Sequence, residues 1–389
     1  MLRSLYSGIS GLRSHQTMLD VTGNNIANVN TTGYKSSAVQ FQDTLSQLIK
    51  GATGPQAQAG GSNPAQIGLG VQVAGISTNF AQGSAQATGR PTDMMISGDG
   101  FFVVQKGGEN LYSRAGSFDF DATGRLVAPG GALVMGWTAQ NGAINTGTAL
   151  GPITLDKNAI APAVATTGAT VTGNLPSDAA TGTALERDIQ IYDASGTARQ
   201  LSLTFTKTAA GWDVKGVDGT TNATGAMTFA NGALTAGGTL TVNGTAVDLT
   251  KVTGFADLST VTISKQNGNE SGTLQSYSLS ADGTLVGSFS NGATEPMARI
   301  ALANFANPGG LEKAGGSTYR SSIDSGNPAL GTAGSGGLGA LQAGSLEMSN
   351  VDLSQEFTNL IVAQRGFQAN ARIITTSDQV LQDLTDLKR

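Results

Sequence analysis

Cysteine is absent from the 389 residues, and histidine occurs only once, as His15. The absence of cysteine excludes disulfides, thiolate metal ligands and cysteine nucleophiles. A single histidine excludes a multi-histidine metal site, and its place near the N-terminus disfavours a Ser-His-Asp triad. Most common routes to catalysis and metal binding are therefore closed, although carboxylate chemistry stays open.

Charge, aromatic side chains and long apolar runs are also scarce. Charged residues make up 13% of the chain and aromatic residues 5%, and the net charge is −5. This balance disfavours a nucleic-acid partner, because nothing would neutralise a run of phosphates. No stretch of about 18 consecutive apolar residues occurs, so we expect no membrane span. The start of the chain lacks the continuous apolar run of a cleavable secretory signal, so export would need a dedicated route.

Glycine is abundant, and with it the signals of β-hairpins. The 55 glycines are roughly twice ordinary usage. Apolar and polar residues alternate in segments such as 201–205, which is the spacing of a half-buried strand. Turn signals separate these segments at 121–124, 193–196, 231–232 and 282–283. The centre of the chain is therefore predicted to be all β.

Both ends of the chain carry the spacing of an amphipathic helix instead. Apolar residues recur at intervals of three and four, as in a coiled-coil seam. We expect the first helix to end in the asparagine-rich stretch 24–30, because Asn and Gly tolerate a left-handed backbone. Ser349 or Asn350 is expected to cap the last helix. The seam residues are Leu5, Ile9, Leu12, Leu19 and Ile26 at one end, and Leu353, Phe357, Leu360, Phe367 and Ile374 at the other.

These one-sided apolar stripes must be buried, and neither helix has a helical neighbour in sequence. The economical solution pairs the first helix with the last as a coiled coil, and packs the pair against copies from other molecules. We name the residues of both stripes the predicted assembly seam. The alternative, in which each helix lies on its own β domain, stays open at this point.

The sequence thus predicts a mainly β fold with α-helical termini, in which an outer all-β domain is nested within an inner one, each barrel- or sandwich-like. Nesting keeps the entry and exit of each domain close together, so the distant termini can meet. The expected parts are a terminal helical coiled-coil domain (1–30 plus 351–389), a connecting segment (31–70 plus 344–350), an inner β domain (71–150 plus 291–343) and an outer β domain (151–290).

Two motifs that could carry chemistry have simpler explanations. The G-x-G-x-x-G spacing at 334–339 follows Asn327-Pro328 and lacks the strand and helix of a dinucleotide site, so we interpret it as a linker. Residues 119–124 resemble the first half of a calcium loop, but its twelfth position is Gly130 instead of Glu, and a hairpin turn fits better. We expect no catalytic residue, cofactor or metal.

Ordered motifs at both ends and in the centre resemble the signatures of the bacterial flagellar rod and hook protein family. The matching segments are 7–12, 24–35, 98–104, 112–118, 349–353, 357–365 and 373–376. The motif residues at the two ends are Asn24, Asn25, Ala27, Asn28, Thr31, Gly33, Tyr34, Lys35, Asn350, Val351, Asp352, Gln364 and Arg365.

The resemblance implies a structural subunit rather than an enzyme. Rod members of this family are much shorter, so the additional segment 151–290 implies the hook subunit, which assembles into a curved tube that transmits torque from rod to filament. The implied partners are copies of itself, the distal rod, hook cap and hook–filament junction proteins, and the flagellar type III export apparatus. The implied location is the flagellum, outside the cell, without a cleaved signal peptide. The terminal helices would be disordered in the monomer.

Three alternatives remain at this point. The nearest is a distal rod subunit with an inserted β domain. A surface adhesin or carbohydrate-binding protein would explain the β-rich centre but not the paired terminal stripes. A glycosidase would need two carboxylates that converge on a cleft.

Overall fold

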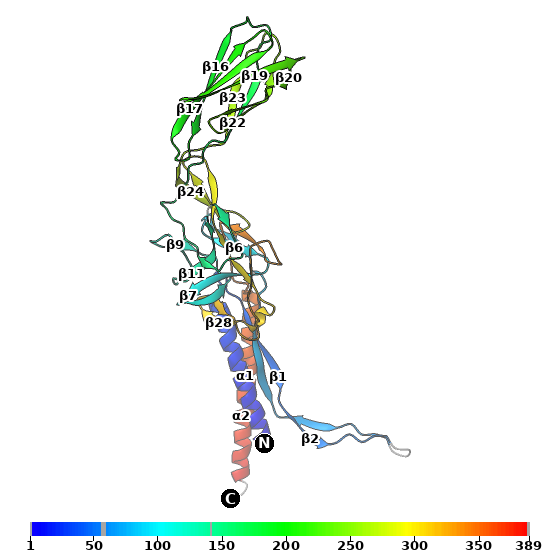
Figure 1. Cartoon of the computed structure of the whole chain (residues 1–389). Coiled ribbons are helices and arrows are strands. Elements are labelled where there is room, and N and C mark those ends of the chain that lie inside the picture. The colour runs from blue at the N-terminus through cyan, green and yellow to red at the C-terminus, as the bar shows by residue number, and fades with distance from the viewer. Residues whose placement is uncertain (1, 56–59, 141, 387–389) are drawn as a thin grey trace. The chain divides into compact units, whose positions relative to one another are not determined.

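A helix at each end and strands in between make up the protein, as the computed structural model shows (Figure 1). The structure describes residues 2–55, 60–140 and 142–386. Helix α1 spans Leu2–Ala27 and helix α2 spans Leu353–Asp386. The prediction of a mainly β fold with helical termini is confirmed. The basic residues Lys388 and Arg389, at the end of the second predicted helix, lie outside the described residues.

The chain divides into two compact units. Unit 1 comprises Met1–Leu155, Leu279–Leu285 and Pro296–Arg389, and unit 2 comprises Asp156–Ser278 and Val286–Glu295. This division is coarser than the four parts expected from the sequence, whose boundaries remain predictions.

The helix ends follow from local polar contacts. In the first helix the Asn28 side chain donates to the Asn24 carbonyl at 2.9 Å, which closes the last turn. Helix α2 is capped by Asp352, whose Oδ1 accepts from the backbone N–H of Ser354 at 2.8 Å. The expected cap at Ser349 or Asn350 was therefore wrong, because the helix begins two or three residues later along the chain than those caps require.

A sheet built around β7 forms the centre of unit 1. Strand β7 (Phe101–Lys106) pairs with β8 (Glu109–Ser113), β11 (Leu133–Gln140) and β27 (Leu302–Asn304). Its first residues are buried on both faces of the strand. Edge-to-face aromatic contacts pack beneath them, with the Phe101 ring 5.8 Å from that of Phe305.

The other strands that include unit 1 residues are mostly short. They are β5 (Ala85–Ala87), β6 (Met94–Ser97), β9 (Asp119–Phe120), β10 (Leu126–Val127), β12 (Ala143–Ile144), β13 (Gly151–Pro152), β25 (Thr284–Phe289), β26 (Thr294–Ile300), β28 (Glu312–Gly315), β29 (Thr318–Arg320), β30 (Ala329–Gly331), β31 (Ala340–Ala343) and β32 (Ser345–Glu347). The segment 334–339 is a loop between β30 and β31 in which Leu338 is buried.

A two-part β arm follows helix α1 in the sequence. Strand β1 (Ser37–Asp43) pairs antiparallel with β4 (Val71–Thr78), and β2 (Ser46–Lys50) pairs with β3 (Ala65–Gly68). The β2–β3 part extends away from the helices (Figure 1). We name residues 37–78 the arm.

Unit 2 is a sandwich of two open sheets. One has the order β16–β17–β18–β19–β20 and the other β21–β22–β15–β23, and both contribute to one apolar core that includes Phe205, Trp212 and Val247. Among the described residues the sheets do not close into a barrel, so the sandwich form of the prediction is the correct one. The sheet strands are β15 (Gly168–Asn174), β16 (Ala184–Tyr192), β17 (Ala198–Lys207), β18 (Trp212–Asp218), β19 (Thr221–Ala230), β20 (Ala233–Ala236), β21 (Thr239–Val242), β22 (Thr245–Thr253) and β23 (Thr262–Gln266), beside β14 (Ile160–Ala161) and β24 (Gly272–Leu279).

The predicted hairpin turns are present where the turn residues demanded them. The signal at 231–232 joins β19 to β20 with Asn231 at φ 52° and Gly232 at φ 79°, a backbone that only such residues adopt readily. The signal at 193–196 joins β16 to β17, and Asp193 Oδ1 accepts from the backbone N–H groups of Ser195 and Thr197 at 2.9 and 2.8 Å.

These hydrogen bonds predict an acid-sensitive turn. The N–H of Thr197 and then the hydroxyl of Ser195 hold the pKa of Asp193 below 3.8. Because the folded-state pKa is the lower one, the turn contributes stability above pH 3.8, and loses it as pH falls through the folded-state pKa.

We expect Asp193→Asn to flatten the fall in thermal stability of the full chain between neutral pH and pH 3, measured by scanning calorimetry. The control is Asp213→Asn, because Asp213 is exposed on β18 and its side chain makes no hydrogen bond within the described residues. Equal acid sensitivity of wild type and Asp193→Asn would contradict the assignment.

Candidate assembly site: the terminal helix pair and its junction

Helices α1 and α2 lie side by side and run antiparallel (Figure 1). Gly8 near the start of α1 faces Ile374, and further along α1 Gly11 faces Asn370. At the other end of the pair, the Asn25 side chain donates to Glu356 Oε1 at 3.0 Å. The predicted pairing of the termini is therefore present within one molecule.

Small residues make the closest contacts of this pair. Gly8, Gly11 and Ser14 are buried in α1, and Ala363 of α2 is fully buried. A methyl group added at Gly11 would lie 2.6 Å from Asn370 Oδ1. The helices thus approach more closely than facing leucines would allow.

The predicted assembly seam is only partly buried by this contact, in which Ile374 faces Gly8. No seam residue is among the buried side chains of the described residues. Leu353 is 40% exposed and Phe357 is 51% exposed. The half-buried seam residues are Leu5, Ile9, Leu12, Leu19, Ile26, Leu360, Phe367 and Ile374. Whether the seam joins one copy to another remains a prediction.

Asn25 connects three elements at the point where the helices meet the rest of unit 1. Its Nδ2 donates to the Ser37 carbonyl at 2.8 Å as well as to Glu356, and its Oδ1 accepts from Ser37 N at 3.0 Å. The Tyr34 hydroxyl donates to the same oxygen at 3.1 Å. Burial, and then the nearby charge of Glu356, raise the pKa of Tyr34. One fully engaged amide thus ties α1, β1 and α2 together.

The remaining residues of the first motif shape the chain between α1 and the arm. Asn28 accepts from the Thr31 hydroxyl at 3.0 Å and donates to Asn24 Oδ1 at 2.9 Å. Gly33 has φ +66°, and a methyl group there would collide with the Ala115 backbone, so only glycine fits. Ala27 is exposed at the last position of α1.

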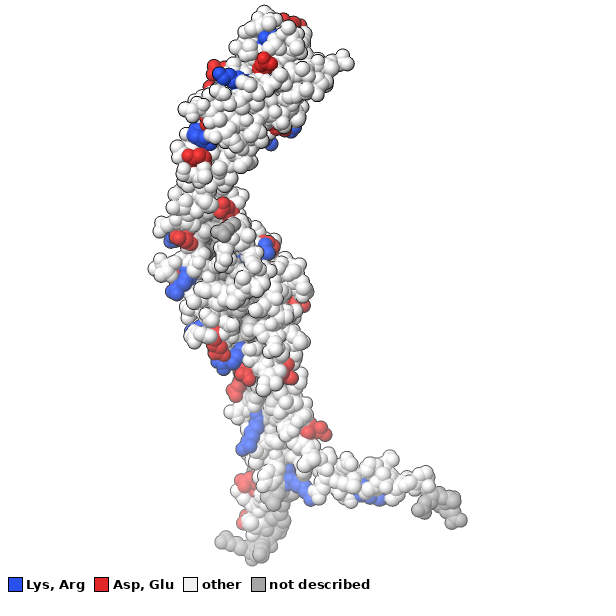
Figure 2. Space-filling view, in the orientation of Figure 1, with Lys and Arg blue, Asp and Glu red and all other residues white. Residues whose placement is uncertain are grey.

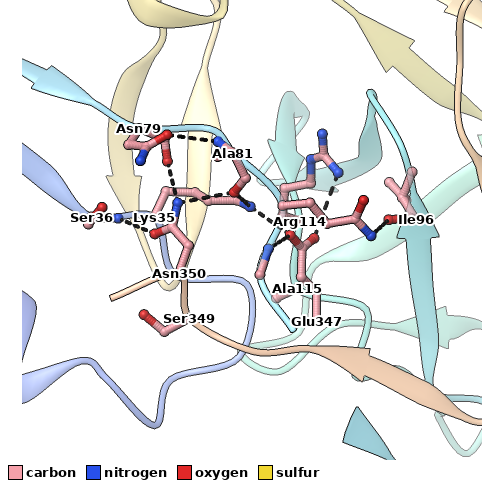
Figure 3. A network of polar contacts seen from close by, with 12 residues as sticks. Lys35, Ser36, Asn79, Ala81, Ile96, Arg114, Ala115, Glu347, Ser349 and Asn350 are labelled. Atoms are coloured by element: carbon pink, nitrogen blue, oxygen red, sulfur yellow. Dashed lines mark hydrogen bonds and ion pairs between the residues drawn. The ribbon is translucent and has the colours of Figure 1, made fainter. Parts of the chain in front are cut away.

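Lys35 ends this motif in a fully buried ion pair (Figure 3). Its Nζ lies 2.6 Å from Glu347 Oε1, and neither side chain is exposed. Nζ also donates to the Ala81 carbonyl at 2.8 Å, and Gly83 N donates to Glu347 Oε1 at 2.9 Å. Arg114 Nη1 lies 3.7 Å from Glu347 Oε2. Burial lowers the pKa of Lys35, although the hydrogen bond and charge of Glu347 oppose that shift.

The C-terminal motif completes the junction with two of its residues. Asn350 donates to the carbonyls of Asn79 and Ala81 at 2.8 and 3.0 Å, and its Oδ1 accepts from Ser36 N at 2.9 Å (Figure 3). Asp352 caps α2. Val351 is half-buried, whereas Gln364 and Arg365 are exposed on α2.

Glu347 and Ser37 are residues of this site that the sequence analysis missed. For Glu347 a signal exists. It is a charged residue between the apolar Leu346 and Met348, and it lies three residues before the motif residue Asn350. Within the described residues no group of His, Asp or Glu side chains could hold a metal ion. None of the described helices combines the length and apolar character needed to cross a membrane.

The geometry defines a β-rich protein whose two chain ends pair as antiparallel helices and join the rest of unit 1 through a buried polar junction. Models of three protein families match the same regions: flagella basal body rod protein (5–35), flagellar hook protein FlgE/F/G D1 domain (95–172) and flagellar basal body rod FlgEFG protein C-terminal (342–387).

Full-length relatives agree with these models. The chain is 39% identical to a flagellar hook protein FlgE of Borreliella burgdorferi, with both chains fully covered. It is 36% identical to the flagellar hook protein FlgE of Salmonella typhimurium, over 99% of this chain and all of that one. It is 35% identical to the flagellar basal-body rod protein FlgG of Bacillus subtilis, with both fully covered. The chain belongs to the flagellar rod and hook protein family, as the motifs indicated.

The buried ion pair gives a quantitative prediction. Lys35→Met leaves Glu347 charged and buried beside Arg114 alone, and removal of one partner of such a pair costs about 3–5 kcal/mol in unfolding free energy. The double variant Lys35→Met/Glu347→Gln removes both charges and should recover part of that loss. Denaturant unfolding of the full chain measures both.

The matched control is the exposed pair of Arg90 and Asp119, whose side chains are 53% and 73% exposed. Arg90→Met should cost about 1 kcal/mol or less. Equal losses for Lys35→Met and Arg90→Met would show that burial of the Lys35–Glu347 pair has no special weight.

Proposed function

We propose that this protein is the structural subunit of the bacterial flagellar hook, and that it self-assembles into a curved tube that transmits torque from the rod to the filament. The observation that carries the proposal is the helix pair. Its closest contacts are made by small residues such as Gly11 and Ala363, and large apolar side chains of α2 stay exposed. The full-length similarity to hook proteins supports it.

Helix α2 presents the larger part of this apolar surface. Its exposed apolar side chains are between 37% and 56% exposed, and they are Leu353, Phe357, Ile361, Val362, Ile373, Val380 and Leu381. Apolar surface of this extent marks an interaction site. Copies of the same chain, which carry the same stripes, are the partners that this surface fits.

The arm adds a second apolar surface within unit 1. Leu45 is 83% exposed, and Leu48 and Ile49 are 54% and 61% exposed. Strands β2 and β3 pair with each other, and every residue of both strands is exposed. Contacts of the arm with neighbouring copies would bury these side chains.

The remaining features follow from a place in the hook. The partners are the distal rod, hook cap and hook–filament junction proteins, and export runs through the flagellar type III apparatus to a site outside the cell. The protein has no enzymatic activity, cofactor or nucleic-acid partner in this proposal. Figure 2 shows charged side chains scattered over the visible face without a broad field of one sign, which fits assembly by packing. A distal rod subunit is the second candidate, because a rod protein is among the relatives.

Immunogold electron microscopy separates hook from rod. An antibody raised against residues 156–278 of unit 2 should label the short curved segment between cell envelope and filament on intact flagella. Label confined to the straight shaft of extracted basal bodies would instead make the protein a rod subunit.

Truncation of an exposed α2 side chain should weaken assembly without weakening the monomer. We expect Phe357→Ala to cost about 2–4 kcal/mol per subunit once its site is buried in the polymer. The critical concentration for polymerisation, measured by sedimentation, should then rise roughly 30-fold or more. The thermal unfolding of the monomer should not change, because Phe357 is 51% exposed there.

Gln368→Ala is the control, since Gln368 is an exposed polar residue of the same helix. An equal rise in critical concentration for both variants would count against an apolar assembly surface on α2. A lower monomer melting temperature for Phe357→Ala alone would show that the side chain stabilises the subunit itself.

A further inference from the structure

A hydrogen bond holds the helix pair together at one end, and glycines lie in the contact along the rest of it. At the junction, Asn25 and Glu356 are hydrogen-bonded at 3.0 Å. Further from the junction, the contact depends on two polar side chains that each face a glycine of the opposite helix. Asn370 of α2 faces Gly11, and His15 of α1 faces Gly366.

Each of these polar side chains makes one further contact. Asn370 Nδ2 donates to the Gly366 carbonyl at 2.8 Å. The His15 ring lies 5.9 Å from the ring of Phe41 in the arm, and its Nδ1 is buried without a hydrogen-bond partner in the described part of the chain. A methyl group at Gly366 would lie 2.5 Å from the His15 ring. Neither side chain can move aside without the loss of one of these contacts.

We propose that Asn370 and His15 are positioning residues that set the axial register of the helix pair, each seated against a glycine of the other helix. Sliding α2 by one turn would bring Asn370 against residues 7–8 or 14–15, and His15 against residues 362–363 or 369–370. Gly8 has room for Asn370, but every residue that His15 would then face carries a side chain where Gly366 has none. The register in turn decides which apolar side chains face neighbouring copies. That last step rests on the proposed function, whereas the register itself does not.

The glycines of the pair show why this arrangement is specific. Alanine is a better helix former than glycine, so glycine within a helix needs a reason. Gly11 and Gly366 have one, because a methyl group at either would collide with the facing side chain. Gly23 has nothing within 4 Å of an added methyl group. Gly→Ala should therefore favour the helix at Gly23 without touching the pair, and should disturb the helix pair at Gly11 and Gly366.

The absence of cysteine allows the register to be measured by engineered disulfides. Gly8→Cys/Ile374→Cys reports the observed register, because a methyl group at Gly8 would lie 3.5 Å from Ile374 Cγ1. Gly8→Cys/Ser377→Cys reports a pair shifted by about one turn. Disulfide yield is measured in the purified full chain and in hooks sheared from cells. The observed-register pair should exceed the shifted pair by about tenfold, which corresponds to roughly 1.4 kcal/mol.

Combining each pair with His15→Ala/Asn370→Ala should bring the two yields to within about twofold of each other. Helicity by circular dichroism is measured alongside, so that loss of register is separated from loss of the helices. An unchanged ratio, equal yields before the alanine changes, or no disulfide in either preparation would overturn the proposal.

Complementary changes provide the second test. Gly366→Ala should lower the observed-register yield about fivefold, and His15→Ala should restore it to within about twofold in the double variant. Asn370→Ala should likewise restore the observed-register yield of the Gly11→Ala variant, but His15→Ala should not restore it. Gly23→Ala should leave the yield unchanged. Restoration by the non-facing partner would overturn the residue-specific assignment.

Polymer formation by the same variants is scored separately. If the disulfide ratios follow the expected pattern but none of the chains polymerises, the register stands and the proposed function fails. If the chains polymerise normally while the ratios do not respond, the register proposal fails and the proposed function stands.

Discussion

The buried ion pair of Lys35 and Glu347 is the constraint on which the arrangement of unit 1 depends. Lys35 follows helix α1 and Glu347 precedes helix α2, and their charged atoms lie 2.6 Å apart with neither side chain exposed. Two charges withdrawn from water are costly unless both are paired and hydrogen-bonded. Here the carbonyl of Ala81 and the N–H of Gly83 supply those bonds. The pair can therefore form only when both ends of the chain have reached the same part of the unit 1 sheet.

Polar and apolar residues have different roles around this junction. The polar residues Asn25, Lys35 and Asn350 connect the chain segments that flank the two helices at the junction. The glycines then let the two backbones approach closely. Large apolar side chains such as Phe357 and Ile361 are left exposed. A subunit of this design keeps its apolar surface for contacts outside itself, which is the property that a self-assembling protein requires.

Periodicity in the sequence predicted both helices, their pairing and the hairpin turns, but it could not predict which helix face closes the pair. Apolar spacing identifies a stripe that must be buried somewhere. It does not say whether the stripe meets its own chain or another copy. Gly11, Ser14 and Gly366 give no hydropathy contrast, so the face that closes is invisible to such a pattern. The choice of Asp352 over Ser349 or Asn350 as helix cap was hidden for a related reason, because all three residue types cap well.

Unit 2 shows how a β-rich protein that assembles can still avoid uncontrolled strand pairing. Strand β16 lies at one edge of its sheet, and an exposed edge is a template for another strand. This strand carries Glu186, Arg187 and Asp188 in succession. Arg187 also spans the sandwich, with its Nε donating to the Val261 carbonyl of the segment before β23 at 2.7 Å. Charges on this edge oppose strand addition, so the sheet edge is a poor template for a neighbouring strand, unlike the exposed apolar side chains of α2 and the arm, which offer no unpaired backbone.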